Sequence, residues 1–209
     1  MVLDVDSTLC GIEGIDWLAA KRGADVALRV AELTESAMRG ELKLEDVYGE
    51  RLKLVSPTAD DIDDLAHAYV GAIAPGAREH VSKWISSGIR VALVSGGIRQ
   101  AIVPVAASLG LPPESVHAVS LDLTNSGDYA GFDASSPLSV ATGKRDIVRE
   151  LQLPAPVIAI GDGATDVYMR EVTDCFVAFT GFAKRAAVIE ASDFTAATFA
   201  ELDKLVTGS

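Results

Sequence analysis

Short apolar runs separated by helix-length segments limit the fold of this chain more than any other feature. Strand-like runs are predicted at residues 1–5, 90–94, 116–121, 157–160 and 175–179. Between several of them, apolar residues recur with helical spacing, at residues 77–87, 98–109 and 144–151. Strands and helices that alternate in this way are typical of a doubly wound, mostly parallel sheet. We therefore predict an α/β fold with a Rossmann-like core.

The segment from residue 12 to residue 72 breaks this alternation, because it has helical periodicity and almost no strand signal. Thr58 followed by Asp61 is typical of a helix N-cap with an acidic partner. We predict that residues 12–72 form a small helical cap and that residues 1–11 and 73–209 form the core. An insertion after the first strand would cover the carboxyl edge of the sheet, where open α/β proteins bind ligands.

A second departure from the alternation lies at residues 126–132, where turn residues precede an alternation of aromatic residues. We predict a hairpin or an edge strand at this position.

The net charge of −12 excludes several classes of partner. Nucleic acids and anionic membranes both require a basic patch, so neither is expected.

No apolar run approaches the roughly 18–20 residues of a membrane-spanning helix, and the N-terminal residues do not resemble a secretion signal. Cys10 and Cys175 are too few for a disulfide framework, so we predict a cytoplasmic protein. We expect a monomer or a homodimer. An anionic substrate would need local positive charge from a metal ion or from a few Lys and Arg residues.

Two carboxylates, Asp4 and Asp6, follow the first apolar run directly. Residues two apart in a strand point to the same side, so both can face one crevice where the strand ends. Such a pair can hold a divalent cation, with one acid as nucleophile and the other as proton carrier. The residues alone do not say which of the two is the nucleophile.

Ser95, Gly96 and Gly97 follow a second apolar run, and a helix is predicted next. A hydroxyl group and two glycines at this position can form a phosphate cradle, because the free amides of a helix start attract an anion. The same three residues could instead form an ordinary turn between a strand and a helix.

Lys144 opens a predicted helix, where the helix dipole disfavours a positive charge. This position suggests a local anion, although most lysines of this kind lie on a solvated helix surface.

Asp162 follows a third apolar run and is flanked by glycines, and Asp166 stands four residues later at the start of another helix. Helix capping could explain part of this pattern. A carboxylate at the mouth of a sheet is costly unless it is paired or bound to a metal. Carboxylates with few nitrogen or sulfur ligands nearby favour Mg²⁺ over Zn²⁺. A hard cation, a Ser/Gly cradle and a lysine together indicate phosphoryl transfer.

These motifs resemble, in the same order, those of the haloacid dehalogenase superfamily of aspartate-nucleophile phosphatases, and within it the phosphoserine phosphatase family. The matching segments are residues 4–8, residues 95–97, Lys144 and residues 161–166. The resemblance implies that Asp4 is the nucleophile and that Asp6 protonates the leaving group and then activates water.

The resemblance also implies a set of ligands. Mg²⁺ would be held by Asp4, by the backbone carbonyl of Asp6 and by Asp162. The phosphoryl group and the rest of the substrate would be bound by Ser95, Gly96, Gly97, Lys144 and Thr165.

Residues of the predicted cap would select the substrate. An amino-acid phosphate needs one counter-charge of each sign, and Arg binds a carboxylate in a fork. By resemblance, Glu13 would bind the substrate amine and Arg51 its carboxylate. Met38 and Gly40 lie in a segment similar to the Met-x-Gly of the family, whereas Leu44 stands where many members have an aromatic residue.

The expected activity is therefore Mg²⁺-dependent hydrolysis of L-phosphoserine, a small phosphomonoester, to L-serine and phosphate. The alternatives are a phosphotransferase to homoserine, a phosphatase for another small phosphomonoester, and a module that binds phosphorylated ligands without catalysis.

Overall fold

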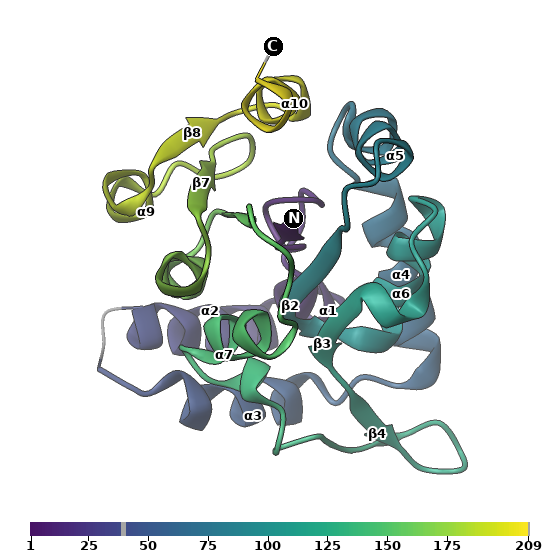
Figure 1. The fold of residues 1–209 in the computed structure, drawn as a ribbon. Coiled ribbons are helices and arrows are strands. Elements are labelled where there is room, and N and C mark those ends of the chain that lie inside the picture. Colours follow the sequence, from purple (N-terminus) through teal and green to yellow (C-terminus); the bar gives the residue numbers. More distant parts are fainter. Residues whose placement is uncertain (39–40, 209) are drawn as a thin grey trace.

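A computed structural model describes residues 1–38 and 41–208 of the chain. In these residues, a six-stranded sheet has the order β3-β2-β1-β6-β7-β8, and its neighbouring strands run parallel. The predicted α/β fold with a parallel sheet is confirmed (Figure 1). The strands of this sheet are β1 (Val2–Leu3), β2 (Ala92–Ile98), β3 (Val116–Val119), β6 (Ile158–Gly161), β7 (Cys175–Phe179) and β8 (Phe194–Ala196).

Helices cover the sheet, and those predicted from apolar spacing are present with closely similar bounds. After the first strand come α1 (Gly14–Lys21), α2 (Ala24–Met38), α3 (Leu44–Val55) and α4 (Ala59–Gly71). The later helices are α5 (Ala77–Ser86), α6 (Arg99–Ser108), α7 (Gly143–Glu150), α8 (Ala164–Val167), α9 (Ala186–Ala191) and α10 (Phe199–Thr207). Within the described residues, no helix combines the length and the apolar character needed to cross a membrane.

The residues between β1 and α5 are helical, as predicted. α1 packs against α2 and α3, whereas α4 packs mainly against α6. Figure 1 shows α1, α2 and α3 grouped at the opposite end of the molecule from α5 and α10. The expected N-cap of α4 is confirmed, because Thr58 and Asp61 form a reciprocal capping box.

The first two strands differ from the prediction at the ends that face the candidate site. β1 ends at Leu3, and the chain then turns through Ser7, whose φ of 51° lies in the left-handed region. β2, in contrast, does not end before Ser95 but continues to Ile98 with an irregular register after Val94. The irregularity has a local cause, since the Gly97 amide donates to Ser95 Oγ at 2.9 Å.

The predicted hairpin is present as an antiparallel pair, β4 (Leu121–Leu123) and β5 (Tyr129–Phe132). The run expected as one strand at residues 116–121 is therefore divided between β3 and β4. The Phe132 ring packs edge-on against Tyr48 of α3, with 5.3 Å between ring centroids. The hairpin thus contacts the helical insertion.

Candidate active site

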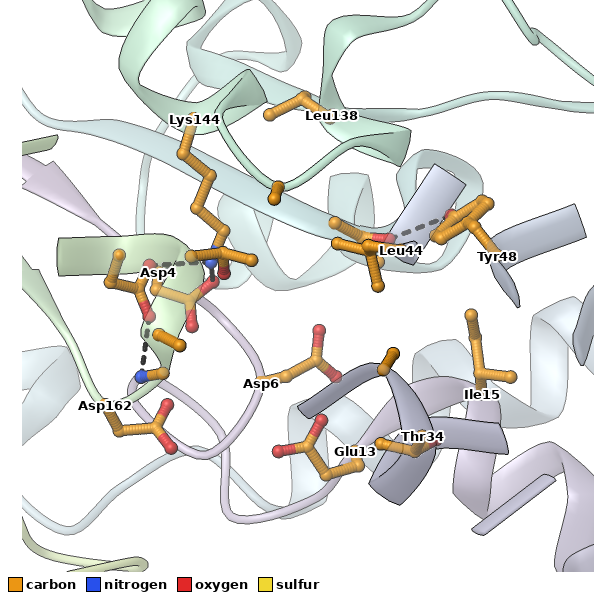
Figure 2. A pocket seen from close by; sticks show the side chains of 18 of the residues that line it. Asp4, Asp6, Glu13, Ile15, Thr34, Leu44, Tyr48, Leu138, Lys144 and Asp162 are labelled. Carbon is orange, nitrogen blue, oxygen red and sulfur yellow. Dashed lines mark hydrogen bonds and ion pairs between the residues drawn. The ribbon is translucent and has the colours of Figure 1, made fainter. Parts of the chain in front are cut away.

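One pocket is lined by Asp4 and Asp6 after β1, by Gly96 and Gly97 of β2, by Asp162 after β6, and by residues of α1, α2 and α3. Figure 2 shows Asp4, Asp6, Glu13 and Asp162 around the same opening. The carboxyl ends of the parallel strands therefore meet where the sequence predicted, and the helical insertion forms the other side of the pocket.

Asp4 is buried, and its carboxylate is paired with Lys144. Lys144 Nζ donates to Asp4 Oδ1 at 2.6 Å and to Asp166 Oδ1 at 2.7 Å. Burial raises the pKa of Asp4 well above its usual value, and the Asp166 carboxylate adds to the rise. Lys144 opposes it. An ionised Asp4 therefore needs positive charge beyond that of Lys144.

Lys144 is buried at the start of α7, and its neighbours explain why a lysine stands at a helix N-terminus. Burial alone would lower its pKa, but the carboxylates of Asp166 and Asp4 outweigh burial and raise it. The local anions expected from the sequence are thus present as two aspartates of the protein itself.

Asp6 accepts hydrogen bonds on both of its oxygens. Gly14 N donates to Oδ1 at 2.7 Å, and Tyr69 Oη donates to the same oxygen at 2.6 Å. Ser95 Oγ donates to Oδ2 over a longer distance of 3.2 Å. Burial, and then the charge of Glu13, raise the pKa of Asp6 to about 6, against the opposing effect of the Tyr69 and Gly14 hydrogen bonds. Asp6 can therefore exist in either protonation state near neutral pH.

A group of three buried carboxylates could hold a metal ion. Oxygens of Asp4, Asp162 and Asp166 lie within 4.8 Å of one another. Thr8 Oγ1 donates to Asp162 Oδ1 at 3.0 Å, and the buried Asp162 Oδ2 forms an ion pair with Arg185 Nη1. The donor set is all oxygen and carries excess negative charge, so it fits a hard divalent cation.

The composition of this carboxylate group agrees only partly with the predicted ligands. Asp4 and Asp162 belong to it, as expected. Asp166 also belongs to it, although the sequence indicated only that it begins a helix. The prediction for Asp6 concerned its backbone carbonyl, which the carboxylate group does not test.

The predicted phosphate cradle lies beside these carboxylates. Ser95 is buried, and Gly96 and Gly97 line the pocket. A Cβ atom at Gly97 would lie 2.9 Å from Asp6 Oδ2 and 3.1 Å from Ser95 Oγ, so only glycine lets this backbone approach so closely. The Gly96 carbonyl accepts a hydrogen bond from Tyr48 Oη at 2.8 Å. Helix α3 is thereby joined to the cradle.

The charged residues predicted to select the substrate also face the pocket. Glu13 accepts a hydrogen bond from Ser7 Oγ at 2.7 Å. The Arg51 side chain is only 11% exposed, and its Nη2 lies 3.4 Å from Asp16 Oδ1. Its buried Nε has no hydrogen-bond partner among the described residues, so the guanidinium retains donors for an anionic ligand.

The remaining predicted residues are placed as follows. Thr165 and Leu44 line the pocket. Met38 ends helix α2, but its side chain is outside what the structure describes. Gly40 lies outside the described residues.

Sequence reasoning missed Tyr48, Tyr69 and Arg185. Arg185 follows β7, lines the pocket and forms an ion pair with Asp162. Its Nη2 also lies 3.7 Å from Glu13 Oε1. None of the three belongs to a strand-end motif, so no local signal distinguishes them from ordinary residues of helices and loops.

The buried aspartates, the lysine and the Ser-Gly-Gly segment of β2 define a class of protein. A sequence model of the haloacid dehalogenase-like hydrolases matches residues 1–171, and the chain belongs to this class. Within the class it belongs to the phosphoserine phosphatase family, because it is 39% identical over 204 residues to the chloroplastic phosphoserine phosphatase of Arabidopsis thaliana, with 95% of this chain and 68% of that protein covered. It is also 37% identical over 202 residues to the phosphoserine phosphatase of Mus musculus, with 95% and 89% covered.

A solved structure agrees with this assignment. The chain is similar to a phospho-aspartyl intermediate analogue of phosphoserine phosphatase, with a TM-score of 0.77, 27% identity, and 98% of this chain and 96% of that chain covered. The resemblance predicted from four ordered motifs is confirmed at the level of the family.

Proposed function

We propose that this protein hydrolyses L-phosphoserine to L-serine and phosphate with the help of Mg²⁺. The observation that carries the proposal is the buried pair of Asp4 and Lys144 beside Asp162, which follows β6, and Asp166 of α8. The names of the relatives support this substrate. The names of the relatives do not favour the alternatives of a homoserine phosphotransferase, a phosphatase for another small phosphomonoester, or a module without catalysis.

Asp4 and Asp6 divide the chemistry between them. An oxygen of Asp4 attacks phosphorus, the bond from phosphorus to the serine oxygen breaks, and Asp6 gives its proton to that oxygen. Asp6 then takes a proton from water, which attacks the aspartyl-phosphate and releases phosphate with Asp4 regenerated. The pKa of about 6 suits a group that must act first as an acid and then as a base.

Asp162, together with Asp4 and the Asp6 backbone carbonyl, would hold Mg²⁺, and the carboxylate group supports Asp166 as a near neighbour of that ion. The bound cation would supply positive charge to the phosphoryl oxygens and favour the ionised form of Asp4. Ser95, the amides of Gly96 and Gly97, Lys144 and Thr165 would hold the phosphoryl group beside it.

Glu13 and Arg51 would recognise the amino-acid part of the substrate. A carboxylate approaching Arg51 would occupy donors that Asp16, at 3.4 Å, uses only weakly. Glu13 would receive the ammonium group. Met38 and Gly40 remain predicted substrate contacts.

Three further expectations concern the domains, the cellular compartment and the oligomeric state. Residues 12–72 would act as the cap over a core of residues 1–11 and 73–209. The protein would act in the cytoplasm, which the two free cysteines support. It would be a monomer or a homodimer.

A panel of three phosphomonoesters tests the proposed substrate directly. Phosphoserine has both charged groups, phosphoethanolamine lacks the carboxylate, and the phosphate ester of 3-hydroxypropanoate lacks the amine. We expect kcat/KM to fall about tenfold or more for each missing group, because a charge-assisted hydrogen bond contributes roughly 1.5–3 kcal/mol. Equal kcat/KM on all three compounds would contradict the assignment of phosphoserine, and transfer to added homoserine in place of release to water would contradict hydrolysis.

A further inference from the structure

Tyr69 places a buried phenol directly against the predicted proton carrier. The residue is on helix α4, has 0% exposure, and donates from Oη to Asp6 Oδ1 at 2.6 Å. A buried tyrosine hydroxyl needs a partner, but an apolar core offers no reason for that partner to be a carboxylate of the candidate active site. Neither the strand-end motifs nor the proposed reaction gives Tyr69 a role.

Gly14 makes room for this hydrogen bond. A Cβ atom at position 14 would overlap Tyr69 Oη, so any other residue would displace the hydroxyl. Gly14 is also the first residue of α1, where backbone amides have no partner inside the helix. Its amide donates to Asp6 Oδ1 at 2.7 Å, and the two donors therefore converge on the same oxygen.

The backbone around Tyr69 holds its ring in a fixed position relative to Asp6. Just after Tyr69, the Ala72 carbonyl accepts a hydrogen bond from Gly11 N at 2.9 Å, and Ala74 N donates to the Leu9 carbonyl at 2.9 Å. The segment that follows Asp6 is thus tied to the end of α4. Because α4 also packs against α6, Tyr69 is supported by the sheet side of the molecule and not only by α1, α2 and α3.

We propose that Tyr69 is a positioning residue for Asp6, which reserves Oδ1 as an acceptor and leaves Oδ2 to carry the proton. Among the described residues, Oδ2 has one longer hydrogen bond, from Ser95 Oγ at 3.2 Å, and it lies beside Gly97. Figure 2 shows the Asp6 carboxylate directed into the pocket. In the proposed reaction, the proton on Oδ2 passes to the serine oxygen as its bond to phosphorus breaks, and Oδ2 later receives a proton from water. The inference rests on the proposed function, since it deepens the role of Asp6.

The test uses the fact that proton donation matters only for a poor leaving group. The alkoxide of serine needs a proton to leave, whereas p-nitrophenolate leaves without one. For Tyr69→Phe we expect kcat on phosphoserine to fall roughly 10- to 100-fold, a part of the usual contribution of general acid catalysis, with little change in KM. The pre-steady-state burst of p-nitrophenolate from p-nitrophenyl phosphate should keep the wild-type rate.

Tyr48→Phe is the matched control. It also removes one buried phenol hydroxyl between the helical insertion and the core, but that hydroxyl donates to Gly96 and not to Asp6. We expect Tyr48→Phe to change the rate at which phosphoserine and p-nitrophenyl phosphate phosphorylate the enzyme by the same factor. If Tyr69→Phe also slows both substrates equally, Tyr69 only supports the fold and the proposal is overturned.

A second variant keeps the test decisive if Tyr69→Phe folds poorly. Gly14→Ala retains the tyrosine but displaces its hydroxyl, so it should show the same dependence on the leaving group, and an equal loss on both substrates would overturn the proposal. Where Tyr69→Phe folds, the effect of Gly14→Ala should be smaller in that background, because the displaced hydroxyl is already absent. Fully additive effects would then contradict the proposal. If the wild-type protein releases no phosphate from phosphoserine, the proposed function fails, and the comparison is made with the alkyl phosphate that the protein hydrolyses fastest.

Discussion

Lys144 and Asp4 are 140 positions apart in the chain, yet Lys144 Nζ lies 2.6 Å from Asp4 Oδ1, and both side chains are buried. Lys144 has a second carboxylate partner in Asp166, at 2.7 Å. One lysine therefore faces two aspartates, and the pair with Asp4 is incomplete without further positive charge. A phosphoryl-transfer site needs this arrangement, because the nucleophile must be ionised where an anionic substrate also binds.

Replacing Asp4 by asparagine should abolish turnover and preserve the fold. The amide has nearly the same shape as the carboxylate but is not a nucleophile. Loss of a nucleophile typically lowers kcat by on the order of 10⁴-fold or more. Phosphate release measures the loss, and circular dichroism with thermal melting checks that the variant is folded. Turnover within tenfold of the wild type would show that Asp4 is not the nucleophile.

Removal of divalent metal should abolish activity, and added Mg²⁺ should restore it. An ion that binds only the folded state stabilises it, by about 2.7 kcal/mol when the free ion concentration is 100 times its Kd. Mg²⁺ should therefore also raise the melting temperature. Asp162→Asn should greatly reduce this thermal shift, since it removes a charged oxygen from the carboxylate group. Activity that is unchanged by EDTA would contradict the proposed cofactor.

Arg51→Ala should separate recognition of the substrate from chemistry. Loss of a charge-assisted hydrogen bond of roughly 1.5–3 kcal/mol should lower kcat/KM for phosphoserine by about 10- to 150-fold. The same variant should leave p-nitrophenyl phosphate almost unaffected, because that compound has no carboxylate. Arg29→Ala is the matched control, since Arg29 lies on α2 with 55% of its side chain exposed and does not line the active-site pocket. An equal loss on both substrates would show that Arg51 does not bind the carboxylate.

The residues that could be predicted from the sequence are those whose position depends on local pattern. Asp4, Ser95 and Asp162 each follow an apolar run, and parallel strands bring their carboxyl ends together, so three short motifs were enough to predict one site. The capping box of Thr58 and Asp61 was found for the same reason, because its two members are only three residues apart.

The residues that could not be predicted depend on how distant elements pack. Tyr69 reaches Asp6 only because α4 packs beside the turn after β1 and because Gly14 leaves space for the hydroxyl. Arg185 reaches Asp162 from the segment after β7, and a loop arginine has no periodic or capping signal. The end of β2 was misplaced because two glycines usually indicate a turn, whereas here they extend the strand against Asp6.

Asp203 joins α10 to α5 and does not line the pocket of the candidate active site. Asp203 accepts hydrogen bonds from Lys83 Nζ at 2.5 Å and from the buried Trp84 Nε1 at 2.9 Å. Asp203→Ala would leave Trp84 Nε1 buried without its partner, so it should lower the free energy of unfolding at pH 7 by about 1–3 kcal/mol. Lys204→Ala, at an exposed position of the same helix, should change it by less than about 0.5 kcal/mol.

The effect of Asp203→Ala should also depend on pH. The hydrogen bond from Lys83 lowers the pKa of Asp203 in the folded protein. Burial opposes this effect, and the hydrogen bond from Trp84 adds to it. A lowered pKa means that this carboxylate contributes its full stabilisation above its unfolded pKa of about 3.9 and loses it as the pH falls through the folded value. Urea unfolding should therefore show a difference between wild type and variant that shrinks as the pH falls below about 4. A difference that grows as the pH falls below about 4 would contradict the assigned ion pair.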